Sequence, residues 1–225
     1  MEQVNWGIIG LGHIAAEVAK VFKFTDNSKL LAIASHDKNK IEQFKKDFQI
    51  NKKFCFNSYD DLIECEEIDV VYVALPNSLH FELISKCLKA NKKLLVEKPA
   101  TLNFSEIEKI KKVFDRKNFF FAEGFMYRHH PQILKTIELL NNKIIGNLIS
   151  MKSYFGKDIL TKKNFFGLKK TKKITKKNRL YNKELGGGAI LDLGCYPVSL
   201  SLLIASLNKN INLDNLFFFV IFFVF

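Results

Sequence analysis

One stretch decides the fold of this chain: Gly7-Ile8-Ile9-Gly10-Leu11-Gly12-His13-Ile14-Ala15. A short apolar run precedes it and a helix-like segment follows, so its glycines lie at a strand-to-helix turn, where this spacing is typical of phosphate binding. Gly10 allows the tight turn, Gly12 leaves the backbone open to a pyrophosphate, and Ala15 permits close packing of the helix on the strand.

The N–H groups of Gly10, Leu11, Gly12, His13 and Ile14 would face the phosphates, together with the positive end of the helix dipole. The pattern therefore predicts a dinucleotide-binding turn. The alternative is a tight turn that serves packing alone, because glycine-rich turns also occur for that reason.

Strand-like and helix-like segments alternate over residues 1–122, which predicts a doubly wound, mostly parallel α/β sheet. Later strands are expected at residues 29–34, 54–56, 68–74, 94–96 and 119–121. Ser58 and Asp61 form a capping box before one helix, and Ser105 and Glu108 form a second before the helix at 107–114.

From residue 123 the pattern changes, and we expect a second domain at residues 123–225. A helix is predicted at 133–140, an extended strand at 147–155 and a loop at 157–182. An apolar helix follows at 189–207, with a kink at Pro197. The last segment, 208–225, continues no α/β pattern.

The composition is ordinary for a soluble globular protein, with 48% hydrophobic and 26% charged residues, but the formal net charge is +12. Much of the excess comes from lysines between residues 157 and 179. Such a cluster could bind nucleic acid or an anionic membrane surface. It contains few aromatic residues and no recognisable nucleic-acid module, so the sequence favours a solvated loop.

The four cysteines show no metal-binding spacing, and neither do the histidines, so no metal site is predicted. The cysteines are expected to be reduced thiols of a cytoplasmic protein. The first strand begins almost at residue 1, which leaves no room for a signal peptide. The apolar run 216–225 is far shorter than the ~20 residues that span a bilayer, so no membrane segment is expected.

Ligands of doubly wound sheets bind at the carboxyl ends of the strands. An NAD-preferring site usually places a carboxylate about 20 residues after the glycine turn, where this chain has Ser35, so the sequence favours NADP over NAD. Asp37 argues for NAD. Three polar stretches are predicted at these strand ends to contact the cofactor: Ser35 with His36, Leu75 with Asn77 and His80, and Glu97 with Lys98.

Hydride transfer at a nicotinamide also requires a group that handles a proton. Lys98 ends a strand at the predicted cleft, and Asp192 and Tyr196 are four residues apart and share one helix face. An ammonium beside a phenol stabilises the phenolate, so the three residues could act together. The spacing leaves other roles open: a surface lysine, a helix-capping aspartate and a packed tyrosine.

Five strings of this chain resemble the Gfo/Idh/MocA oxidoreductase family, in family order: residues 7–15, 72–80, 96–99, 123–131 and 179–197. The last string most resembles the branch of dimeric dihydrodiol dehydrogenases and NADP-dependent xylose dehydrogenases. The resemblance implies a Rossmann domain at 1–122, followed by an α+β domain at 123–225. In the family that second domain has an open, largely antiparallel sheet that often forms a homodimer interface.

The resemblance also implies roles for single residues. Lys98 would lie beside the nicotinamide of NADP or NAD, before a proline whose peptide bond is often cis in the family. Tyr196 would be the catalytic acid or base, supported by Asp192, and Tyr127 would line the substrate site. The substrates would be sugars, polyols or cyclic diols.

The chain is shorter than the family pattern, so we expect a C-terminally truncated second domain with an aberrant tail at 208–225. Three hypotheses follow from the sequence. The first is an NAD(P)-dependent oxidoreductase, the second a cofactor-binding remnant without activity, and the third a basic protein that binds nucleic acid.

Overall fold

The computed structural model describes residues 2–114, 119–156, 158, 161–163, 165, 167–171 and 179–207. The chain divides into two compact units, Met1–Gly124 and Phe125–Phe225. The predicted tail at 208–225 and much of the lysine-rich segment lie outside the described residues.

The first unit is built on a sheet of six strands in the order β3-β2-β1-β4-β5-β6, and every neighbouring pair is parallel. The order runs outward from β1 in both directions, so the predicted doubly wound sheet is confirmed. The strands are β1 (Val4–Ile9), β2 (Ser28–Ala34), β3 (Cys55–Phe56), β4 (Val70–Val73), β5 (Lys93–Val96) and β6 (Phe121–Glu123).

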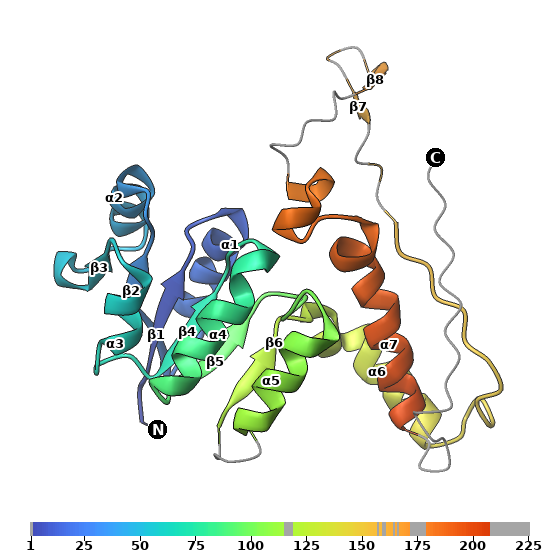
Figure 1. The fold of residues 1–225 in the computed structure, drawn as a ribbon. Coiled ribbons are helices and arrows are strands. Elements are labelled where there is room, and N and C mark those ends of the chain that lie inside the picture. Colours follow the sequence, from blue (N-terminus) through green and yellow to red (C-terminus); the bar gives the residue numbers. More distant parts are fainter. Residues whose placement is uncertain are drawn as a thin grey trace. The chain divides into compact units, whose positions relative to one another are not determined.

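Helices cover both faces of this sheet (Figure 1). Right-handed crossovers place α1 and α2, which lead from β1 towards β3, on one face, and α4 and α5, which lead from β4 towards β6, on the other. The helices are α1 (His13–Val21), α2 (Lys38–Asp47), α3 (Tyr59–Glu64), α4 (His80–Lys89) and α5 (Phe104–Phe114), with short 3-10 turns η1 (Phe22–Phe24), η2 (Lys52–Phe54) and η3 (Asn77–Leu79).

Strands β1 and β4 form the centre of the core. Ile8 and Ile9 are 0% exposed, and every residue of β4 is buried. A strand that is covered on both faces has no polar side, which explains why the β4 segment is an unbroken run of β-branched and aromatic residues.

The caps of two helices test the predictions from sequence. Ser58 accepts backbone N–H bonds from residues 60 and 61 and caps α3, as predicted. The second capping box is wrong: Asn103 accepts from the Glu106 amide, and the Glu106 carboxylate accepts from the Leu102 amide. Because α5 already begins at Phe104, Ser105 lies inside the helix and cannot cap it. Strand β6 also begins later than predicted, at Phe121, where it pairs with Leu94.

The second unit begins with a 3-10 turn and a well-capped helix. His130 caps α6 (Pro131–Asn141) by accepting the Gln132 amide, and Pro131 occupies the first helical turn, where its missing N–H costs nothing. The helix predicted at 133–140 is confirmed, and it begins two residues earlier, at Pro131. The turn that precedes α6 is η4 (Met126–His129).

Two predictions for the second unit are wrong. Residues 147–155 form no strand, because no described strand of this unit lies beside them to complete a ladder. The predicted loop at 157–182 contains an antiparallel hairpin, β7 (Thr161–Lys163) with β8 (Lys169–Thr171). An extended segment becomes a strand only where a partner strand is available.

The apolar helix near the end of the described chain is irregular. A π-helical stretch, η7 (Ile190–Gly194), precedes α7 (Cys195–Ser206). The kink was predicted at Pro197, but the irregular stretch ends at Gly194, before the proline. Pro197 itself stands in the first turn of α7, where proline is tolerated. Two 3-10 turns lead into this helix, η5 (Arg179–Tyr181) and η6 (Lys183–Leu185).

Within the described residues, one helical stretch, Lys183–Ser206, is long and apolar enough to cross a membrane by length and composition, with a mean hydropathy of 1.6. A single stretch of this kind is weak evidence for a membrane span, because the core helix of a soluble protein passes the same test. The sequence prediction considered only residues 216–225 for this role.

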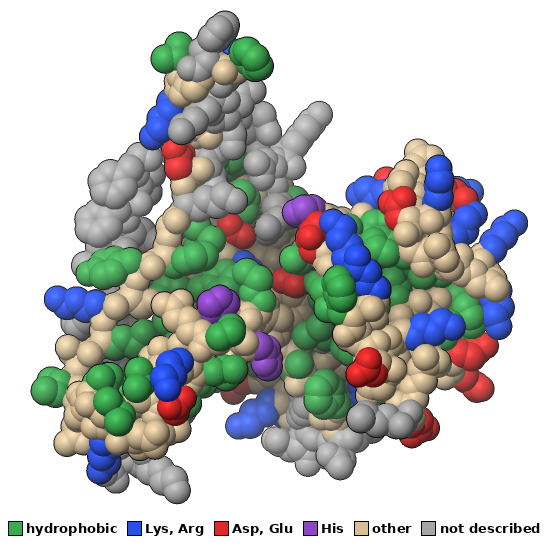
Figure 2. Space-filling view, turned by 180° about the vertical axis from the view of Figure 1, so that it is seen from behind, with side chains coloured by type: hydrophobic (Ala, Val, Ile, Leu, Met, Phe, Trp, Pro, Cys, Tyr) green, Lys and Arg blue, Asp and Glu red, His purple; other side chains and the backbone are tan. Residues whose placement is uncertain are grey.

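The described part of the second unit exposes large apolar side chains. Ile149 is 96% exposed, Tyr154 83% and Ile144 68%. Figure 2 shows such side chains in green at the surface. The contiguous buried core, by contrast, consists of residues of the first unit. The first unit therefore supplies the rigid platform on which a site can be built.

Gly10 is the position where this platform is least tolerant of a side chain. Its φ is +90°, and a Cβ there would lie 2.6 Å from the Ala74 carbonyl oxygen and 2.7 Å from the Leu75 side chain. We expect Gly10→Ala to lower the free energy of unfolding by about 2–4 kcal/mol, measured by urea denaturation, because it adds backbone strain and overpacking.

The matched control is Gly12→Ala, whose new methyl group meets no atom within 4 Å. Its φ of −96° suits any residue, so its stability should stay within about 1 kcal/mol of the parent. Equal losses in the two variants would contradict this account of the turn.

Candidate functional site

The turn between β1 and α1 has the geometry of an anion-binding site. At Gly12 no atom lies within 4 Å of the position that a Cβ would occupy, so the space above the backbone is open. No side chain caps α1, whose first turn contains no acidic residue. The N–H groups at this helix start can therefore donate to a phosphate, and the residues present fit a dinucleotide.

The other residues predicted at this turn differ in how far their side chains are exposed. Leu11 is 5% exposed and belongs to the core, so it contributes its backbone and not its side chain. His13 and Ile14 are exposed at the start of α1. Ala15 is fully buried beneath them, which agrees with close packing of α1 on the sheet.

At the carboxyl end of β2 the structure changes the interpretation of Asp37. Its carboxylate accepts the Asn39 and Lys40 amides and caps α2, so it is engaged by its own helix. The Ser35 hydroxyl accepts the Asp37 amide at 3.1 Å. The argument from Asp37 for NAD therefore loses its support.

His36 follows Ser35 on the exposed side of this strand end. Its Nδ1 lies 2.9 Å from the Asn57 carbonyl oxygen, and its ring stacks on Tyr59 with centroids 4.2 Å apart. Ser35 itself is 6% exposed. The end of β2 thus carries a hydroxyl and an imidazole oriented by its neighbours. The nearby carboxylate, that of Asp37, caps α2.

The loop after β4 places its predicted residues inside the molecule. Asn77 is 5% exposed and His80 is 0% exposed, while Leu75 is half-buried. The His80 ring lies between two backbone carbonyls: Nδ1 is 2.8 Å from the Pro99 oxygen and Nε2 is 2.9 Å from the Leu75 oxygen. His80 therefore connects the loops that follow β4 and β5.

The loop after β5 carries Glu97 and Lys98, both half-buried. The Lys98–Pro99 peptide bond is cis, as the family resemblance implied. The Tyr72 hydroxyl donates to Glu97 Oε1 at 2.6 Å. Burial raises the pKa of Tyr72, and the Glu97 carboxylate raises it further, so the phenol keeps its proton and acts as a donor.

Tyr196 lies in a cluster of aromatic rings in the second unit. Its ring centroid is 5.0 Å from that of Phe155, 5.7 Å from Phe125 and 6.1 Å from Tyr127. Asp192 is half-buried in the π-helical stretch one turn before Tyr196. Lys98 belongs to the first unit, so its convergence with Tyr196 and Asp192 stays a prediction.

Tyr127, predicted at the substrate site, is bound within the second unit. Its hydroxyl shares a 2.8 Å hydrogen bond with the Ser199 hydroxyl, and Arg128 Nη2 donates to the same oxygen at 3.1 Å. Ser199 is 7% exposed. The sequence analysis missed Ser199, although its position three residues after Tyr196 was a signal that the two share a helix face.

A profile of the Gfo/Idh/MocA family, described as an oxidoreductase family with an NAD-binding Rossmann fold, matches residues 4–125. The match covers the whole parallel sheet, from the first residue of β1 to two residues beyond β6. The chain belongs to this family. The resemblance seen in the five sequence strings and the Rossmann fold are both confirmed.

Relatives and solved structures extend the similarity beyond the sheet. Trans-1,2-dihydrobenzene-1,2-diol dehydrogenase of Xenopus tropicalis is 30% identical over 196 residues, which are 86% of this chain and 54% of the relative. A mutant 3-ketoreductase from Actinomadura kijaniata, solved in complex with TDP-benzene and NADP, superposes with a TM-score of 0.70 at 26% identity, over 90% of this chain and 57% of that one.

A third similarity is to scyllo-inositol dehydrogenase from Lactobacillus casei, solved with NAD(H) and scyllo-inositol. It has a TM-score of 0.60 and 27% identity, over 64% of this chain and 43% of that one. This Gfo/Idh/MocA chain spans about half the length of the curated relatives that it matches. The predicted kinship with dihydrodiol dehydrogenases is confirmed by the first relative.

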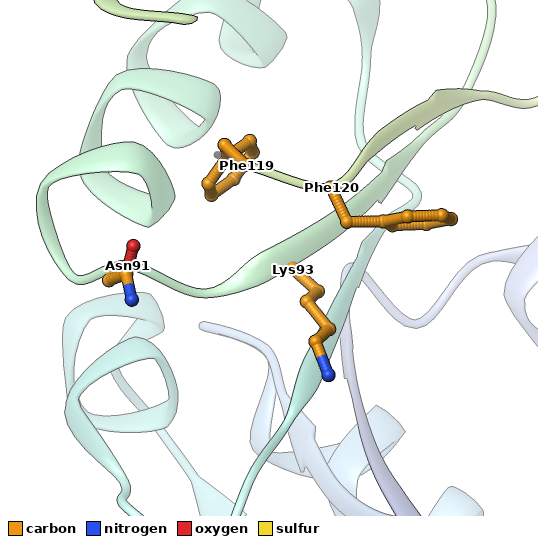
Figure 3. A pocket seen from close by; sticks show the side chains of 4 residues that line it. All are labelled: Asn91, Lys93, Phe119 and Phe120. Carbon is orange, nitrogen blue, oxygen red and sulfur yellow. The ribbon is translucent and has the colours of Figure 1, made fainter. Parts of the chain in front are cut away.

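One hollow of the described surface, of about 320 Å³, is lined by Asn91, Lys93, Phe119 and Phe120 (Figure 3). Lys93 begins β5, so this hollow lies at the amino end of the strand, opposite the end that carries Lys98. Among the described residues, no three His, Cys, Asp or Glu side chains form a group that could hold a metal ion.

The open backbone at Gly12 predicts that a side chain at this position weakens cofactor binding. A methyl group there contacts nothing in the protein and occupies the space that a pyrophosphate needs. We expect Gly12→Ala to weaken NADPH binding by about tenfold or more, measured by isothermal titration calorimetry, while the fold keeps its stability. Unchanged affinity in this variant would show that the phosphates do not lie against this turn.

Proposed function

We propose that this family member is an NADP-preferring oxidoreductase that transfers a hydride between the nicotinamide and a hydroxyl or carbonyl group of a sugar, polyol or cyclic diol. The observation that carries the proposal is the β1–α1 turn, where open backbone at Gly12 meets the uncapped start of α1. Its relatives support this activity, because they include a diol dehydrogenase, an inositol dehydrogenase and a 3-ketoreductase.

The protein would hold the cofactor along the carboxyl edge of the sheet. The amides of residues 11–14 would bind the pyrophosphate, and Ser35 and His36 would contact the ribose that distinguishes NADP from NAD. Leu75 and Asn77 would line the nicotinamide side with the loop after β5. When bound, the nicotinamide supplies or accepts the hydride.

The accompanying proton is assigned to three side chains. The Tyr196 phenol would donate the proton to the substrate oxygen or accept it, and the Lys98 ammonium would stabilise the phenolate. The Asp192 carboxylate would orient the substrate hydroxyl or Lys98, and Tyr127 would border the substrate. The aromatic rings around Tyr196 support this role, because they hold its ring in place.

The location and partners of the protein are proposed on the same basis. We propose a cytoplasmic enzyme that acts on a small-molecule substrate. All four cysteines are reduced thiols, and burial raises the pKa of Cys87 to about 12, which agrees with an unreactive thiol in a reducing compartment. A homodimer through the second domain stays a prediction.

A second candidate function is cofactor binding without turnover. The observation that favours it is the exposure of large apolar side chains in the described part of the second unit, where Ile149 is 96% exposed and Tyr154 83%. Binding and activity measurements separate the two functions. An inactive binder would bind NADPH but would oxidise or reduce no member of a panel of sugars, polyols and diols.

We expect Lys98→Ala and Tyr196→Phe each to lower kcat by about 10²–10⁴-fold, the usual contribution of a positioned acid or base. The Kd for NADPH should stay within about threefold, because the pyrophosphate is held elsewhere. Steady-state rates followed by NADPH absorbance give kcat, and fluorescence titration gives Kd.

Matched controls exist for both substitutions. Lys93→Ala changes a lysine at the other end of the same strand, and Tyr154→Phe changes a tyrosine that is 83% exposed. Both controls should keep the parent kcat. Full activity in Lys98→Ala or Tyr196→Phe would remove the corresponding residue from the mechanism.

The choice of NADP is tested by charge at the end of β2. We expect Ser35→Asp to raise the Kd for NADPH by about tenfold, because its carboxylate would repel the 2′-phosphate, and to leave or lower the Kd for NADH. Ser35→Asn has the same size without the charge and should keep the preference. Asp37→Asn should also keep it, since asparagine can cap α2 equally well. A preference for NADH in the parent protein would overturn this assignment.

A further inference from the structure

The residue before Lys98 is fixed by a buried phenol. Tyr72 stands in the middle of β4 and is 0% exposed, and its hydroxyl donates to Glu97 Oε1 at 2.6 Å. A neutral donor on a carboxylate makes a strong, charge-assisted hydrogen bond. The raised pKa of Tyr72 keeps the proton on the phenol, so the phenol is the donor in this bond.

The residue after Lys98 is fixed by a buried imidazole. His80 begins α4 and is 0% exposed, with its ring nitrogens 2.8 Å from the Pro99 oxygen and 2.9 Å from the Leu75 oxygen. Carbonyl oxygens only accept, so a neutral ring donates to one of these two oxygens, and a ring with hydrogen on both nitrogens donates to both. In either form the ring lies between the main chain beside Lys98 and the start of the loop after β4.

The next residue is fixed by a carboxylate from a third element. Glu123 is the last residue of β6, and its Oε1 accepts the Ala100 amide at 2.8 Å. The backbone adds a second link between these elements, because the Gly124 amide donates to the Val96 carbonyl at 2.7 Å. The end of β6 is thus bound both to the end of β5 and to the loop that follows it.

We propose that Tyr72, His80 and Glu123 are positioning residues for Lys98. They come from three different elements and contact the Glu97 side chain, the Pro99 carbonyl and the Ala100 amide, so the chain is held on both sides of Lys98. Burying polar groups is costly unless each is paired, and here all three are directed at one four-residue loop. This inference rests on the proposed role of Lys98 in proton handling, where a small displacement of the amine lowers the rate.

Tyr72→Phe is the cleanest test, because it removes one oxygen atom and keeps the ring that packs in the core. We expect amide hydrogen exchange of residues 97–100 to rise by about tenfold, measured by mass spectrometry of peptides. The rate at which acetic anhydride acylates Lys98 should change by about threefold or more relative to Lys93 in the same sample. In the active enzyme kcat should fall by about tenfold, with the Kd for NADPH within about twofold.

Glu123 offers a rescue and a matched control. Glu123→Ala should loosen residues 97–100, and Glu123→Gln should restore most of the parent behaviour, because the amide oxygen still accepts a hydrogen bond. The control is Glu106→Ala, since Glu106 accepts the Leu102 amide at 2.9 Å in the same way but outside the loop. It should leave the acylation rate of Lys98 unchanged.

The outcomes separate this inference from the proposed function. Parent-like acylation of Lys98 in both Tyr72→Phe and Glu123→Ala would overturn the inference, even if amide exchange rises, because the contacts would then serve stability alone. An equal effect of Glu106→Ala would overturn it as well. If the parent protein fails to bind NADPH, the proposed function fails, while exchange and acylation still decide whether these residues position Lys98.

Discussion

The close approach of the β1–α1 turn to the end of β4 is the constraint on which the rest of the structure depends. The Gly10 amide donates to the Ala34 carbonyl of β2, and the Ala74 amide donates to the Ile9 carbonyl of β1, so the turn is bound to both neighbouring strands. A Cβ at Gly10 would lie 2.6 Å from the Ala74 oxygen. Only glycine allows this approach. Because the turn lies this close, the carboxyl ends of β1, β2, β4 and β5 form one edge of the sheet, and this edge carries the predicted site.

Much of the first unit could be predicted because its signals are local. Glycine spacing, the cap at Ser58 and the apolar run of β4 each depend on a few neighbouring residues. The contacts around Lys98 depend on tertiary structure instead. Tyr72 had the pattern of a core residue, and nothing in the sequence indicates that its hydroxyl reaches Glu97, 25 positions later. The position of Asp37 before α2 was a local signal for a helix cap, but it was interpreted as a signal for NAD.

The second unit was harder to predict because its elements depend on partners. An extended strand was predicted at 147–155, yet a strand requires a neighbour, and the described residues supply none there. Most side chains of this segment are correspondingly exposed, with Ile149 at 96%. The helical segment from Ile190 to Ser206 was predicted because a long apolar run indicates a helix, and a helix forms its hydrogen bonds without a partner. The chain thus combines a Rossmann unit that contains the contiguous buried core with a second unit whose described part exposes large apolar side chains.

The central claim is that a dinucleotide lies against the main chain at the β1–α1 turn. Its most direct measurement is the ¹⁵N–¹H NMR spectrum of protein labelled at its 11 glycines, recorded during titration with NADPH. The account predicts the largest shifts at Gly10 and Gly12, and none at Gly146 or Gly156 of the second unit. Saturable binding that leaves Gly10 and Gly12 unshifted would contradict it.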